Sequence, residues 1–208
     1  HVVARSGILV TSIRFLFLAS ALALLGAGPG ATGAPIVAAG KAEATIVVGS
    51  GSVAEYAARE LAYHIERATG VKVPVVAEGA APKAGPLIYV GDGQAVRAAG
   101  IDVAKLPPDV FTIKTEGETL SIAGEDLKGD PIDEDTRAGT LWGVYEWLEQ
   151  VLKVRWLWPG ELGTYVPKSP TVTMGALNQT TPPRFVQRKI RAGPGLADKP
   201  APLGFTPA

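Results

Sequence analysis

Six acids in one loop are the first residues in this chain that could do chemistry. The loop contains Glu125, Asp126, Asp130, Asp133, Glu134 and Asp135. Carboxylate oxygens suit a calcium ion, but this spacing matches no EF-hand, so we expect a solvated acidic connection. Glycoside hydrolysis uses two carboxyl groups at a defined separation, and the sequence places no such pair in a cleft. We assign no catalytic residue and no metal ligand.

A glycine pattern offers a second kind of site. Gly49-x-Gly51-x-x-Ala54 follows a predicted strand and opens a helix, as in the dinucleotide fingerprint, and Glu78 stands where a ribose-binding acid belongs. The pattern is short, and the later segments do not continue a repeating βαβ series. A turn in which Ser52 caps the next helix explains the same residues. Dinucleotide binding is therefore kept as an alternative, and we assign no cofactor.

Aromatic side chains form the third group. All four tryptophans of the chain lie within residues 137–160: Trp142, Trp147, Trp156 and Trp158. Their flat faces could stack on sugar rings, and burial in a core or an interface would account for them equally well. Trp156 and Trp158 are two apart on a predicted strand and so share a face. Arg155 then points the opposite way, and we expect it to pair with an acid.

Two elements must position these aromatic residues. A helix is predicted from about residue 137, because apolar residues recur at three- and four-residue spacing. This stripe consists of Leu141, Val144, Tyr145, Leu148, Val151 and Leu152. A strand follows at 154–158, and Pro159-Gly160 stops it.

The rest of the chain predicts one α/β domain, a two-layer sandwich of a mixed sheet with two main helices packed on it. The first main helix spans 53–68, with Thr69-Gly70 as its stop, and a brief helix covers 94–99. Buried strands are predicted at 45–48, 73–76 and 87–90. Segments 111–115 and 119–123 alternate around Gly117-Glu118, which predicts an antiparallel hairpin with one wet face.

The run RAGTLWGVYEWLEQVLKVRWLWPG resembles the N-terminal domain of family 67 glycoside hydrolases, the α-glucuronidases, and of related large secreted proteins of unassigned activity. The resemblance is carried by Gly139, Tyr145, Leu148, Glu149, Arg155, Trp156, Pro159 and Gly160. Residues 57–75 are similar to the first helix and second strand of that domain, and the similarity spans roughly residues 43–190.

In such proteins the domain precedes a catalytic (β/α)8 barrel, and residues 183–188 are similar to the lead-in to the first barrel strand. The resemblance implies a non-catalytic accessory domain of a secreted glycoside hydrolase-like protein in polysaccharide metabolism. Its partners would be its own downstream barrel, which is missing from this chain, and an oligosaccharide. The implied substrate or barrel-interface residues are Arg155, Trp156, Trp158, Pro159 and Gly160. An independent carbohydrate-binding module is the alternative.

The two ends of the chain are set apart from the domain. Arg5 and Arg14 precede an apolar run at 15–25 and a small-residue stretch, so we expect residues 1–34 to be an export signal. The run is shorter than the ~20 residues of a membrane anchor, and no stable span is expected after cleavage. The protein would be periplasmic or extracellular. We place the domain at 35–175, with a linker and the start of a truncated barrel at 176–208.

The composition of the chain limits the classes of partner and ligand that we expect. The formal net charge is zero, so no global field attracts nucleic acid, and we expect none as a partner. The chain contains no cysteine, which excludes disulfides and thiolate metal sites. The core alone must hold this domain together.

Overall fold

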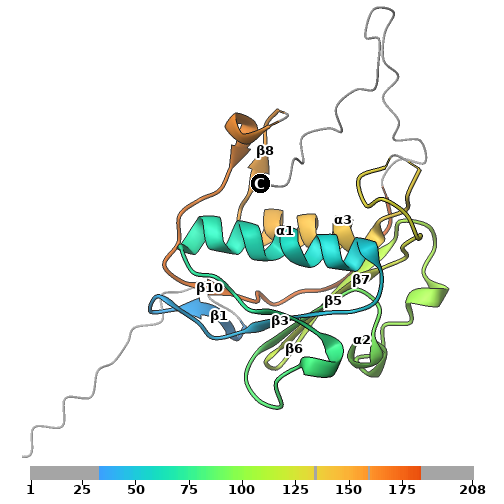
Figure 1. Ribbon diagram of the computed structural model, residues 1–208, viewed down its shortest axis with the longest axis horizontal. Helices are drawn as coiled ribbons and strands as arrows, with labels where there is room; N and C mark the ends of the chain where they lie inside the picture. Colours follow the sequence, from blue (N-terminus) through green and yellow to red (C-terminus); the bar gives the residue numbers. More distant parts are fainter. Residues whose placement is uncertain (1–32, 134, 159, 184–208) are drawn as a thin grey trace, which may run out of the picture.

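The computed structural model describes residues 33–133, 135–158 and 160–183 (Figure 1). Its centre is a six-stranded mixed sheet in the order β11-β6-β7-β5-β3-β4. The strands are β3 (Thr45–Val48), β4 (Val75–Ala77), β5 (Leu87–Val90), β6 (Phe111–Glu116), β7 (Thr119–Gly124) and β11 (Asn178–Thr181). Strands β4, β3, β5 and β7 run parallel, whereas β6 and β11 each pair antiparallel to their neighbours.

Two helices form the second layer. Helices α1 (Ser52–Thr69) and α3 (Gly139–Gln150) lie side by side on one face of the sheet, and the short α2 (Gln94–Ala98) lies on the other (Figure 1). The predicted α/β sandwich with a mixed sheet and two main helices is thus confirmed. None of the helices described here combines the length and apolar character needed to cross a bilayer.

The core lies between α1, α3 and the facing side of the sheet. Strand side chains alternate in direction, so Ile88 and Val90 of β5 face the helices together with Leu120 and Ile122 of β7. The predicted apolar stripe is buried at Leu141, Val144, Tyr145 and Leu148 of α3 and at Leu152 beyond its end, whereas Val151 is partly buried. The apolar periodicity therefore identified the buried faces correctly.

Both ends of α1 lie close to the predicted limits. Gly70 ends the helix in the left-handed conformation (φ 76°), and its N–H donates to the carbonyl of Glu66. The N-terminal cap differs from the expectation, because Gly51 occupies the cap position. Ser52 is the first helical residue, and its hydroxyl donates to the carbonyl of Gly129 at 2.7 Å. Ser52 thus ties α1 to the acidic loop.

Two smaller sheets complete the domain. Strand β1 (Pro35–Ala38) pairs with β10 (Val172–Thr173) and β2 (Lys41–Ala42), and it buries Ile36 and Val37 against the main core. Strand β8 (Arg155–Trp156) pairs with β9 (Thr164–Tyr165) in a projecting hairpin whose tip contains the 3-10 turn η3 (Glu161–Gly163) (Figure 1). The strand predicted at 154–158 is therefore shorter, although the Leu157 N–H still donates to the carbonyl of Gly163 next to the last strand pair.

Strand β11 is an edge strand of the main sheet. Its residues fall in the segment that the sequence assigned to a linker, yet they pair along the whole of β11 with β6. The Thr180 and Thr112 hydroxyls lie 2.9 Å apart across this pair. The sequence Asn-Gln-Thr-Thr has no apolar alternation to signal a strand. The sheet consequently extends past residue 175, at least to Thr181.

The sequence predicts that one face of the β6–β7 hairpin is exposed to solvent, but part of that face is buried in the structure. Ala123 on the second face of β7 is buried against Val96 of α2 and Ile101. The other two 3-10 turns, η1 (Glu78–Ala80) and η2 (Val103–Lys105), flank α2 on either side in the chain. This end of the second sheet face is therefore covered.

Candidate functional site

An aromatic row crosses the outer side of the helix layer and joins it to the β8–β9 hairpin. The Trp156 ring of β8 meets Tyr145 of α3 edge to face at a centroid distance of 5.1 Å, and it meets His64 of α1 at 5.6 Å. The row continues to Trp142 at 6.1 Å from Tyr145 and to Tyr63 at 5.1 Å from His64. Edge-to-face pairs contribute roughly 0.5–1.5 kcal/mol beyond burial. Trp156 therefore fixes the base of the hairpin on α1 and α3.

A buried carboxyl group lies beneath this row. Glu60 of α1 accepts a hydrogen bond from the Tyr145 hydroxyl at 3.3 Å, and both residues are buried. Burial raises the pKa of Glu60, although the bond from Tyr145 opposes the shift. Burial also raises the pKa of Tyr145. The pair links α1 to α3 by a polar contact within an otherwise apolar interface.

His64 adds a second titratable group to this cluster. Its Nδ1 lies 2.9 Å from the carbonyl oxygen of Glu60, so this nitrogen donates to that carbonyl. Burial lowers the pKa of His64, which favours the neutral ring. Glu60 supplies the buried carboxyl group of this cluster.

The hairpin is also held at its tip. The Tyr63 hydroxyl donates to Glu161 of η3 at 3.0 Å, and Arg67 lies 3.6 Å from the same carboxylate oxygen. The sequence reasoning missed Glu60, Tyr63 and Glu161. A signal existed for Glu60, because it and His64 interrupt the apolar face that Ala57, Leu61 and Ile65 form on α1.

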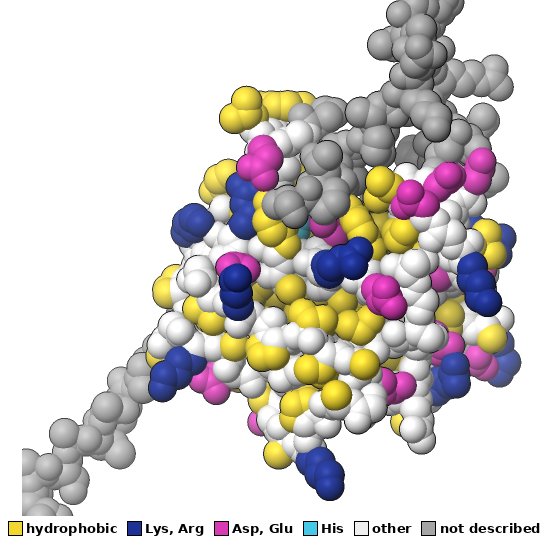
Figure 2. Space-filling model, viewed as in Figure 1, with side chains coloured by type: hydrophobic (Ala, Val, Ile, Leu, Met, Phe, Trp, Pro, Cys, Tyr) yellow, Lys and Arg dark blue, Asp and Glu magenta, His cyan; other side chains and the backbone are white. Residues whose placement is uncertain are grey.

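Large apolar side chains are exposed on this anchored hairpin. We call Leu157, Trp158, Leu162 and Tyr165 the hairpin patch. Trp158 is 57% exposed and Leu162 is 92% exposed, while Trp142 on adjoining α3 is 42% exposed. Figure 2 shows hydrophobic side chains at the hairpin and above α1, in the upper part of the view. Exposed large apolar side chains gathered on one hairpin make it a candidate interaction site.

The proposed interface residues have unequal roles. Arg155 donates to the backbone carbonyls of Glu149 and Val154, at 3.1 and 2.7 Å, rather than to an acid as expected. Its guanidinium thereby satisfies the carbonyl of Glu149 in the last turn of α3 and that of Val154, the residue directly before it. Gly160 has a φ of 92°, and its carbonyl accepts bonds from the turn that follows. Pro159 lies outside the described residues. Trp156 anchors the hairpin on α1 and α3, whereas Trp158 is exposed to solvent.

The acidic loop uses its carboxylates locally. Glu125 pairs with Arg137 at 2.6 Å, and Asp130 and Asp133 each accept a backbone N–H two residues on. Asp126 accepts the N–H of Thr140 at 2.8 Å and so caps α3 from another part of the chain. Within the described ranges, no group of three acids or histidines is arranged to hold a metal ion.

Asp126 should make the stability of the domain depend on pH. Burial raises its pKa from 3.8 to about 6, so the folded state favours the protonated carboxyl. This contribution is complete below pH 3.8 and is lost as the pH rises through about 6. We expect Asp126→Asn, which can still accept the Thr140 N–H, to gain up to about 3 kcal/mol relative to the wild type between pH 4 and pH 7.5. Urea unfolding at both pH values measures the difference. A constant difference would contradict the assignment.

The glycine pattern lies where the loop after β3 packs closely against the loop after β5. A Cβ on Gly49 would lie 2.3 Å from the carbonyl oxygen of Asp92, and one on Gly91 would lie 2.3 Å from the Cβ of Ala54. Glu78, the expected ribose-binding acid, accepts the N–H of Ala95 at 2.9 Å in the first turn of α2. These contacts give Gly49, Ala54 and Glu78 structural roles.

Comparisons with known proteins give similarity in structure only. No protein family matches the chain by sequence, and no curated protein matches it. Among solved structures, the chain is similar to a family 20 β-N-acetylhexosaminidase from Streptomyces coelicolor A3(2), at 15% identity and a TM-score of 0.44 over 75% of this chain and 25% of the enzyme.

Two further similar structures are also glycoside hydrolases. One is a family 115 4-O-methyl-α-glucuronidase with specificity for decorated arabinogalactans, at 17% identity and a TM-score of 0.44 over 72% of this chain and 18% of that one. The other is a family 138 enzyme targeting pectin rhamnogalacturonan II, at 16% identity and a TM-score of 0.37 over 69% of this chain and 16% of that one. The chain thus spans a quarter or less of the length of these enzymes.

Proposed function

We propose that this chain is the non-catalytic front domain of an exported glycoside-hydrolase-like protein that acts on polysaccharide. Its hairpin patch, together with Trp142, packs against the catalytic domain that follows it in the same polypeptide. The chemistry belongs to that second domain. The resemblance of residues 137–160 to the α-glucuronidase front domain makes family 67 the first candidate for the parent.

The observation that carries this proposal is the exposure of large apolar side chains on an anchored hairpin. Solvent-facing Trp158 and Leu162 lower the solubility of an isolated domain, whereas burial at an interface removes that cost. Trp156 and Glu161 hold the hairpin on α1, so the patch is formed before any partner binds. A preformed patch loses less conformational entropy on association.

The first test is the reading frame after residue 208. The proposal expects a (β/α)8 pattern there, with two acids at the ends of barrel strands. A reading frame that encodes no such domain would contradict the proposal. If the frame does encode it, the downstream domain is produced separately and its affinity for the 208-residue chain is measured by calorimetry.

We expect Trp158→Ala to weaken that affinity at least about 10-fold, because a central aromatic anchor commonly supplies 2 kcal/mol or more. Val75→Ala is the matched control. Val75 is also an exposed apolar residue, at 42%, but it lies in β4 at an edge of the main sheet and not on the hairpin. This control should bind like the wild type. Equal weakening by both variants would place the interface elsewhere.

A carbohydrate-binding module is the second candidate, and the exposed faces of Trp142 and Trp158 favour it. Such a module binds longer glucuronoxylan oligosaccharides more tightly, and Trp158→Ala abolishes this gain. Titration of the chain with oligosaccharides of increasing length separates the two proposals. The accessory role expects no dependence on length and no effect of Trp158→Ala.

A further inference from the structure

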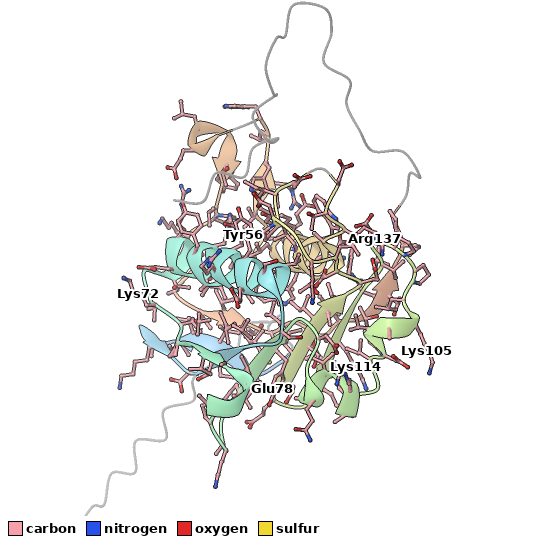
Figure 3. All side chains as sticks on the ribbon, turned by 45° about the vertical axis from the view of Figure 1, so that its right-hand side comes forward. Tyr56, Lys72, Glu78, Lys105, Lys114 and Arg137 are labelled. Atoms are coloured by element: carbon pink, nitrogen blue, oxygen red, sulfur yellow. The ribbon has the colours of Figure 1, made fainter. Side chains whose placement is uncertain are left out.

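The second face of the sheet carries a pocket far from the hairpin patch. Helix α2 has only five residues, so it covers part of the face that β5, β7 and β6 present on this side. A cavity of about 280 Å³ remains beside it. Its lining includes Tyr89, Ala98, Ala99, Lys114, Glu116 and Ser121. In Figure 3, Lys114 lies beside α2, while Tyr56 lies at α1 on the opposite side of the sheet.

Strand register explains why these side chains meet. Tyr89 of β5 is paired with Ser121 of β7, and Ser121 is paired with Lys114 of β6. Paired residues of adjacent strands point to the same face, so the three side chains form one row across the sheet. Glu116 lies two residues after Lys114 on β6 and therefore shares its face. The pocket is thus built on strands, which hold its floor in place.

The charges in the pocket are balanced. The Lys114 ammonium lies 3.0 Å from the Glu116 carboxylate and donates to the carbonyl of Ala99 at 2.8 Å. With one positive and one negative side chain, the pocket has no net attraction for an anion or a cation. The same pair offers both a donor and an acceptor at the rim. The methyl groups of Ala98 and Ala99, with the Tyr89 ring, add apolar surface.

We propose that this pocket binds a single neutral sugar ring. A pyranose combines an apolar C–H face with a rim of hydroxyl groups that donate and accept, which matches the Tyr89 and alanine surface and the Lys114–Glu116 pair. The volume lies just below the usual range for small-molecule sites, so it suits one ring. The choice of a sugar among neutral polyols rests on the proposed function, whereas the pocket itself does not.

The test is an NMR titration of the full 208-residue chain with glucose, galactose and xylose, and with glucuronate as the charged probe. We expect saturable amide shifts at Tyr89, Ser121 and Ala98 with the neutral sugars, at millimolar dissociation constants. Ala98→Phe places a ring at the pocket edge on an exposed helix position and should weaken binding at least about 10-fold. Ala104→Phe, exposed outside the lining, should bind like the wild type.

Three results would overturn the proposal. They are no saturable shift at about 50 mM of any neutral sugar, tighter binding of glucuronate than of the neutral sugars, and sugar affinity unchanged by Ala98→Phe. Trp158→Ala separates this proposal from the docking role. It should leave sugar binding at the pocket unchanged, even where it weakens binding to the downstream domain.

Discussion

Trp147→Ala is expected to lower the free energy of unfolding by about 3–5 kcal/mol. The Trp147 side chain is fully buried in α3, and its indole N–H donates to the carbonyl of Met174 at 2.8 Å. Truncation removes a large apolar contact and leaves that carbonyl without its donor. It also loosens the segment that carries β10, because Met174 follows β10 directly. Urea unfolding monitored by circular dichroism measures the loss.

Trp142→Ala is the matched control in the same helix. Trp142 is 42% exposed and contacts Tyr145 at the end of the aromatic row, so we expect its loss to cost about 1 kcal/mol or less. The comparison tests whether the tryptophans of α3 divide into a core residue and a surface residue. Similar losses for the two variants would contradict that division.

Gly124→Ala is expected to cost about 2–4 kcal/mol through a clash between backbones. A Cβ at Gly124 would lie 2.3 Å from the carbonyl carbon of Gly139 and 2.6 Å from the nitrogen of Thr140. These are backbone atoms of the first turn of α3, so a rotamer change cannot relieve the contact. The helix itself would have to move away from β7. That shift would also stretch the bond from the Gly124 N–H to the Thr140 hydroxyl, now 3.0 Å.

Gly79→Ala provides the comparison for Gly124→Ala. A Cβ at Gly79 in η1 would meet nothing within 4 Å, and Gly79 is not among the glycines with positive φ. We expect a change within about 0.5 kcal/mol for this variant. Thermal unfolding of the two variants under the same conditions measures the difference in their stability. A stable Gly124→Ala protein would show that α3 does not sit on β7 as described.

Several elements could be predicted from the sequence because their signals are local. Strands β3 and β5 begin and end where their β-branched and apolar runs do, and α1 and α3 follow from apolar residues at helical spacing. The short strands β8 and β9 and the polar β11 carry little such signal. They exist because a neighbouring strand supplies the hydrogen bonds, and that neighbour is distant in the chain.

The candidate site was predictable only in part, for the same reason. The cluster of tryptophans in 137–160 is visible in the sequence, but the spacing placed Trp156 and Trp158 on one face and did not predict that Trp156 packs on α1 and α3 while Trp158 is exposed. Arg155 bonds the carbonyl of Glu149 in place of the expected acid, because the turn between α3 and β8 brings that carbonyl within reach of its guanidinium. The neutral pocket beside α2 depends on the register of three strands, which no local pattern encodes.

The sequence by itself determined where α1, α3, β3 and β5 lie and which faces of the two helices are apolar, since periodicity is a property of consecutive residues. Only the tertiary structure decided that Trp147 is buried while Trp142 is exposed, although both flank the same stripe. It also decided that Glu60 is buried, because its partner Tyr145 lies 85 residues away in the chain. The physical reason is that burial and hydrogen bonding are set by what packs against a side chain, and packing partners are chosen by the whole fold.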